Sequence, residues 1–176
     1  MAKKFPVFAT VALGMPHMRG SRELFREILR QNLMDAGIKE FEQSHRENVF
    51  DDPPFTVAST ETEVDLVAPS LAELGINNPP SLALLYERAV GQGLGLCAWE
   101  AGVRFRLTRP LQAGDERLIV ALQLSPLTNN FPLFDVGQDD SHPYLRGYYA
   151  FPGNLRGLGE RFVFSQDRNG QGCFAL

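Results

Sequence analysis

The sequence predicts an α+β fold in which N-terminal helices pack on a mainly antiparallel β-sheet. Two observations support this prediction. Helical periodicity is confined to the first half of the chain, and from Leu94 onward apolar and polar residues alternate between turn signals. Helices that precede a run of strands, rather than alternating with strands, favour α+β over a parallel α/β sheet. The length of 176 residues fits one domain, so we expect residues 1–176 to form a single α+β domain.

The N-terminal segment joins two lysines to an apolar stretch and superficially resembles a signal peptide. Pro6 and Thr10 interrupt that stretch, and no small-residue cleavage site follows. We therefore expect residues 5–13 to form a strand and the protein to be cytoplasmic. No apolar run approaches the roughly 18 residues of a membrane-spanning helix, so no membrane association is expected.

The clearest helix is expected from Ser21 to Ala36. Ser21 is a good N-cap, Gly37 supplies the C-terminal stop, and the apolar residues between them recur at helical spacing. A second helix is expected over residues 81–90, where apolar residues again recur at helical spacing. The sequence GQGLGL at 91–96 closes that helix, whereas a phosphate-binding glycine loop opens one, so we interpret it as a helix C-cap.

Three further local signals complete the first half of the chain. Ser70 and Glu73 form a capping box, which predicts a short helix that Gly75 ends. Residues 55–69 are rich in β-branched side chains and predict a strand. Residues 38–50 carry no pattern that predicts a structure.

The second half predicts six strands by alternation and by the turn residues between them. These strands are expected at residues 94–98, 103–108, 117–124, 131–136, 144–150 and 161–166.

Charge and cysteine content exclude several classes of function. The formal net charge is −4, from 17 Lys and Arg against 21 Asp and Glu, and no basic run is present. A dedicated nucleic-acid binder concentrates positive charge, so no nucleic-acid partner is expected. Cys97 and Cys173 are far apart and form no C-x-x-C motif. Cys97 lies in an apolar segment, which is typical of an inert buried thiol.

Six segments of the chain stand in a characteristic succession, namely LAELGI, YERAVGQGLGLCAWEAGVRFRL, GDERLIVAL, FPLFDV, YLRGYYAFPG and RFVF. In this succession residues 66–166 resemble a small bacterial protein family to which no activity is assigned. In that family a helix ends in a Gly-Leu step before a Leu-Cys-Pro motif, and here Ala98 stands where the proline is expected. The resemblance implies a shared fold over this region, and it implies no activity or catalytic residue.

An acidic cluster within eight residues provides the strongest candidate for catalytic chemistry. It consists of Asp135, Asp139, Asp140 and His142. Carboxylates and an imidazole can bind a divalent cation, which gives the hypothesis of a small metal-dependent hydrolase. The same residues are also typical of a hairpin loop between the strands at 131–136 and 144–150, and this interpretation is preferred.

The segment from Tyr144 to Glu160 is the preferred interaction surface. Tyr144, Arg146 and Tyr148 share one strand face, and Tyr and Arg are enriched at protein–protein hot spots. Arg156 lies in a glycine-rich loop, from Gly153 to Gly159, that we expect to reshape around a partner.

The chain carries none of the local motifs G-x-S-x-G, H-E-x-x-H or S-x-x-K. No catalytic residue and no cofactor are therefore assigned, although a triad of Cys97, His142 and an aspartate stays open because triads assemble in space. The preferred hypothesis is a non-catalytic protein-interaction module, of an accessory, immunity or antitoxin-like kind, with a protein partner. The alternatives are the metal-dependent hydrolase and a small-ligand-binding domain with a pocket between the first helix and the sheet.

Overall fold

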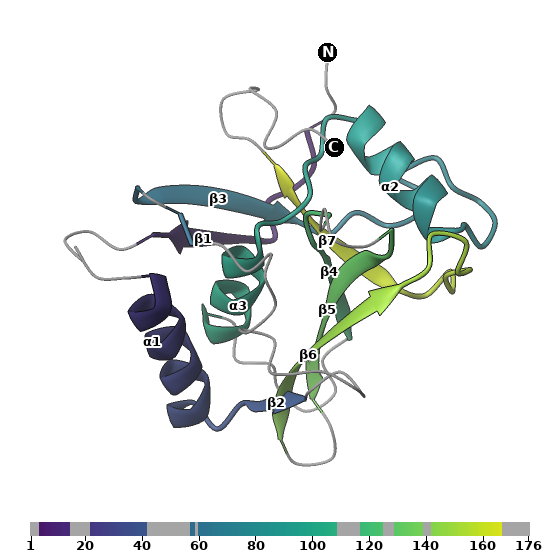
Figure 1. Ribbon diagram of the computed structural model, residues 1–176. Coiled ribbons are helices and arrows are strands. Elements are labelled where there is room, and N and C mark those ends of the chain that lie inside the picture. The colour runs from purple at the N-terminus through teal and green to yellow at the C-terminus, as the bar shows by residue number, and fades with distance from the viewer. Residues whose placement is uncertain are drawn as a thin grey trace.

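The computed structural model describes residues 4–14, 22–41, 57–58, 60–108, 117–124, 129–138 and 142–166. Among the described residues, the three helices and the first three strands precede residue 109, and the elements that follow, β4 to β7, are strands (Figure 1). In chain order the elements are β1 (Ala9–Leu13), α1 (Arg22–Asp35), β2 (Lys39–Phe41), β3 (Thr62–Val67), α2 (Leu82–Gly91), α3 (Trp99–Thr108), β4 (Leu118–Ala121), β5 (Phe131–Gln138), β6 (Pro143–Ala150) and β7 (Arg161–Gln166).

Within the described residues, seven strands form one sheet in the order β1-β3-β7-β4-β5-β6-β2. Four neighbouring pairs are antiparallel, and the pairs β4–β7 and β2–β6 are parallel. The twist of the sheet turns β1 and β3 across the direction of β4 to β6 (Figure 1). The predicted combination of helices with a mostly antiparallel sheet is thus confirmed as a mixed α/β fold.

Both faces of the central strands are buried, and successive residues of each strand enter different cores. Ile119, Leu133 and Phe162 pack beneath α2, on what we call the α2 face. Val120, Phe134 and Val163 pack against α3, on the α3 face, where α1 contributes Leu29 and Leu33. Figure 1 shows α2 and α3 on opposite sides of these strands. A sheet covered on both faces explains why β4 is buried at every position.

Helices α1 and α2 begin and end close to the predicted residues. The predicted stop at Gly37 is confirmed, because this glycine has a φ of +66°. The Ser81 hydroxyl accepts a hydrogen bond from the backbone N–H of Leu84 and caps α2. At Gly93, φ is +86°, so the glycine sequence after α2 is a helix C-cap as expected. Local capping chemistry therefore fixes both helices.

The capping box of Ser70 and Glu73 is formed, with the backbone N–H of Ser70 donating to Glu73 at 2.8 Å. It stabilises a series of turns rather than the short helix that was predicted. Of the segment 38–50, residues Lys39–Phe41 form β2, and residues 42–50 lie outside the described part of the chain.

The prediction of a strand at 103–108 is wrong, because these residues belong to α3. Val103 and Phe105 alternate with Arg104 and Arg106, and that alternation indicated a strand. In the structure α3 is buried on most of its circumference, Arg106 included, so it lacks the single apolar stripe that marks a surface helix. The helices consequently do not form one N-terminal group ahead of the sheet.

The close approach of α3 to the sheet depends on Gly102. A Cβ atom at this position would lie 2.4 Å from Cδ2 of Phe134. The glycine, unfavourable in a helix interior, is therefore required by packing rather than by backbone conformation.

The segment 94–98 joins the sheet only through isolated bridges, Gly95 to Ser165 and Cys97 to Leu122. The strands predicted at 117–124, 131–136, 144–150 and 161–166 correspond to β4, β5, β6 and β7. Across the described ranges, no helix is long and apolar enough to cross a membrane.

Candidate functional site

Strand β6 presents the predicted interaction residues on the α2 face. In the register with β5, Tyr144 lies opposite Gly137, Arg146 opposite Asp135 and Tyr148 opposite Leu133. The Tyr144 ring covers Gly137 so closely that a Cβ there would lie 2.4 Å from the tyrosine hydroxyl. The guanidinium of Arg146, which is exposed, lies 5.3 Å from the centre of the Tyr144 ring.

Asp135, the first residue of the acidic cluster, lies on this same face and is 1% exposed. Its Oδ1 accepts a hydrogen bond of 2.7 Å from Nε of Arg117, a side chain that is half exposed. This charge-assisted bond raises the pKa of Arg117 and occupies one oxygen of the carboxylate. Asp135 is thus already compensated by an arginine.

The rest of the acidic cluster is only partly described. Asp139 and Asp140 lie outside the described residues, and His142 is exposed just before β6. Among the residues that are described, no three His, Cys, Asp or Glu side chains gather as metal ligands would. The metal hypothesis gains no support from Asp135 and His142 themselves.

Cys97 is fully buried in the core of the α3 face, as expected for an inert thiol. Cys97 forms an isolated β-bridge with Leu122, and the N–H of Leu122 donates to the carbonyl of Pro132. Cys97 therefore lies near the start of β5. His142 lies by the other end of β5, six residues further, which is roughly 20 Å along a strand. A triad of Cys97 and His142 is therefore incompatible with this fold.

The loop from Phe151 to Glu160, which we call the 151–160 loop, exposes an unusual amount of apolar surface. Phe151 is 67% exposed, Leu155 74% and Leu158 54%. Leu84, on the adjoining first turn of α2, is 38% exposed. Isolated exposed leucines are ordinary, but several large apolar residues exposed in one short loop make it a candidate interaction surface.

Hydrogen bonds hold the 151–160 loop against α2. The carbonyls of Pro152 and Asn154 accept from the N–H groups of Ala83 and Leu82, at 2.9 and 3.0 Å. The N–H of Arg156 donates to the carbonyl of Pro80 at 2.9 Å. These bonds use the first orphan N–H groups of α2, so the loop completes the helix terminus. The loop expected to reshape around a partner has a defined conformation.

Arg156 projects from this loop onto the α2 face, and its side chain is 11% exposed. Its Nη2 donates to Oε1 of Glu160 at 2.7 Å, and its guanidinium lies 5.5 Å from the centre of the Phe162 ring. The other Glu160 oxygen, Oε2, accepts from the N–H of Gly157 at 2.9 Å. Glu160 therefore engages only one arm of the guanidinium, and Nε of Arg156 is buried with no partner among the described residues.

Tyr148 brings a second buried polar atom to the same place. Its hydroxyl oxygen lies within reach of the Arg156 guanidinium, and its hydroxyl proton meets no acceptor in the described part of the structure. Burial raises the pKa of Tyr148, and the positive charge of Arg156 opposes that rise. Buried donors without partners are rare and costly, so Tyr148 and Arg156 form the strongest candidate site.

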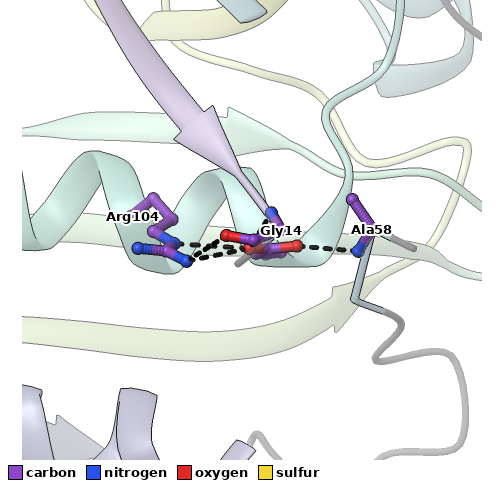
Figure 2. A network of polar contacts seen from close by, with 4 residues as sticks. Gly14, Ala58 and Arg104 are labelled. Carbon is purple, nitrogen blue, oxygen red and sulfur yellow. Dashed lines mark hydrogen bonds and ion pairs between the residues drawn. The ribbon is translucent and has the colours of Figure 1, made fainter. Parts of the chain in front are cut away.

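A second buried polar cluster shows what a purely structural network looks like here (Figure 2). Glu100, in the first turn of α3, is 1% exposed. Its two oxygens accept from the backbone N–H groups of Gly14 at 2.8 Å and Ala58 at 2.9 Å. Arg104 bonds to Glu100 at 3.3 Å and to the Gly14 carbonyl at 2.9 Å. Every oxygen of Glu100 is used, so this network fastens β1 and residues 57–58 to α3.

Comparison with protein-family models, curated proteins and solved structures finds no match. The predicted resemblance of residues 66–166 to a bacterial family stays a prediction. The function has to be argued from the residues themselves.

Sequence reasoning selected Tyr148 and Arg156 and missed what surrounds them. The exposed leucines were visible as apolar residues inside a glycine-rich loop, where polar residues are the rule. The monodentate role of Glu160 had no sequence signal, because it depends on the N–H of Gly157 taking the second oxygen.

Proposed function

We propose that this protein is a non-catalytic interaction module that binds another protein through the 151–160 loop and the neighbouring β6. The proposal rests on one observation above the others. A loop fastened by backbone hydrogen bonds presents Phe151, Leu155 and Leu158 to solvent. Apolar side chains that are held in place but mostly exposed contribute little to the stability of this fold, and a partner that covers them accounts for their exposure.

The fastened loop also favours tight binding. A surface that is ordered before association loses little conformational entropy when the partner docks. The aromatic and arginine residues beside it, Tyr144 and Arg146, are of the types that dominate interface energies. The proposal includes a cytoplasmic protein partner and no cofactor, with residues 1–176 acting as one domain.

The expected energetic contribution can be stated for Leu155. Full burial of a leucine side chain contributes about 1.5–3 kcal/mol, and roughly three quarters of Leu155 is available. Removal of the Leu155 side chain should therefore weaken binding of the partner by about 1–2 kcal/mol, or roughly 5- to 30-fold. An aspartate at this position adds the cost of burying a charge.

The test is capture of partners by the tagged protein from a lysate of its source cells. Wild type is compared with Leu155→Asp and Phe151→Ser. The matched control is Met34→Asp on α1, since Met34 is 62% exposed but lies outside the loop. We expect one stoichiometric partner that both loop variants lose and the control retains. A partner retained by both loop variants, or lost equally by the control, would rule out this surface.

A further inference from the structure

We propose that Arg156 and Tyr148 form a carboxylate-binding site, which receives an aspartate or glutamate side chain of the protein partner next to an apolar residue. This inference rests on the proposed function and specifies the chemistry of the partner. It depends on how the donors of Arg156 are distributed and on the apolar surface around them.

An arginine recognises a carboxylate best through two parallel N–H donors, and Nε with Nη2 forms such a fork. In this protein Nη2 donates to Glu160 while Nε donates to no described atom. Glu160 does not bridge the two donors, because its Oε1 accepts from Nη2 while its Oε2 is turned to the N–H of Gly157. The internal carboxylate thus fills half of the fork.

Tyr148 supplies the third donor. Its buried hydroxyl oxygen lies within reach of the Arg156 guanidinium, which can only donate to it, and the hydroxyl proton has no acceptor among the described residues. A tyrosine hydroxyl can donate to a carboxylate oxygen, as can both arginine groups. An ionised carboxylate, which only accepts hydrogen bonds, can satisfy all three donors.

The surroundings determine what the carboxylate is attached to. Leu155 and Leu158 flank Arg156 in the chain and are largely exposed. Nε of Arg156 and the Tyr148 hydroxyl are buried, so an incoming carboxylate reaches them by displacing Glu160, whose side chain is 26% exposed. A side chain of the partner that carries its carboxylate next to an apolar group therefore matches this site in both charge and hydrophobicity.

The site can be tested on the isolated protein with a small probe. The probe is 3-phenylpropionate, and the matched control compound is 3-phenylpropionamide, which has the same shape without the charge. The observable is the ¹⁵N–¹H resonance of the Arg156 Nε–H, assigned by its loss in Arg156→Lys. We expect a saturable shift with the carboxylate and none with the amide.

Two variants separate binding from mere structural support. Tyr148→Phe removes one hydrogen bond to the charged carboxylate of the probe, so it should lower the affinity for the probe roughly tenfold. In Glu160→Gln the amide oxygen can still accept from the N–H of Gly157, but no internal carboxylate competes with the probe for Arg156. The affinity for the probe should therefore rise several-fold. Circular dichroism of both variants verifies that they are folded.

The result separates this inference from the proposed function. An absent shift, an equal shift with the amide, or a Glu160→Gln variant that binds the probe more weakly would overturn the carboxylate site. None of these results bears on partner capture through Leu155. Conversely, a bound probe with capture unaffected by Leu155→Asp would support the carboxylate site alone.

Discussion

Replacement of Glu100 by glutamine should be among the most destabilising isosteric changes in this protein. The side chain keeps its volume, but the amide offers one acceptor oxygen where the carboxylate offers two. The N–H groups of Gly14 and Ala58 each bond to a different oxygen of Glu100. Whichever way the amide turns, one of these donors faces an NH₂ group.

The magnitude follows from the loss of one hydrogen bond to a charged acceptor and the burial of an unpaired donor. Each effect is about 1–3 kcal/mol, and they overlap, so we expect a loss of about 2–4 kcal/mol in the free energy of unfolding. The weakened ion pair with Arg104 contributes little more, since that arginine is 23% exposed. For a chain of this length the melting temperature should fall by roughly 5–15 °C.

The assay is equilibrium unfolding in urea, followed by the fluorescence of Trp99. This residue is the only tryptophan of the chain, is 4% exposed and precedes Glu100. We expect a lower midpoint and an unchanged slope. The control is Glu87→Gln on the exposed side of α2, which should stay within about 0.5 kcal/mol of wild type. If Glu100→Gln were equally neutral, the network in Figure 2 would not fasten β1 to α3.

Two further predictions concern single positions. Gly14→Ala should lower stability by about 1–3 kcal/mol in thermal unfolding, because φ is +76° and a Cβ would lie 2.6 Å from the carbonyl oxygen of Thr60. The control is Gly153→Ala, which should be neutral because nothing lies within 4 Å of its added Cβ. Tyr86→Phe tests alkaline stability: burial holds the pKa of Tyr86 well above its usual 10, so the folded state keeps a proton that the unfolded state releases. Stability from this group is complete below pH 10 and declines above it by up to about 1.4 kcal/mol per pH unit. The free energy of unfolding, measured by denaturation, should be the same for Tyr86→Phe and wild type at pH 8 and higher for the variant at pH 11. An equal loss of stability between pH 8 and pH 11 in both proteins would contradict the assignment to Tyr86.

The sequence by itself determined the elements whose signals are local. The caps at Ser81 and Gly37 and the alternation over residues 144–150 act within a few residues, so they predict α1, α2 and β6 without knowledge of the rest. The same alternation correctly placed Tyr144, Arg146 and Tyr148 on one face of their strand. The apolar residues on either side of Cys97 likewise indicated that this thiol is buried.

Only the tertiary structure decided α3, the order of the strands and the contents of the candidate site. Burial around most of α3 removed the periodic stripe by which a helix is recognised, and Val103 and Phe105, which alternate with arginines, are residue types that favour strands. The bond between Gly14 and Glu100 joins residues 86 positions apart, and the unused donor of Arg156 depends on where the loop places Glu160. Contacts of this kind have no local signature, because they arise from the packing of distant segments and not from the conformational preferences of any one of them.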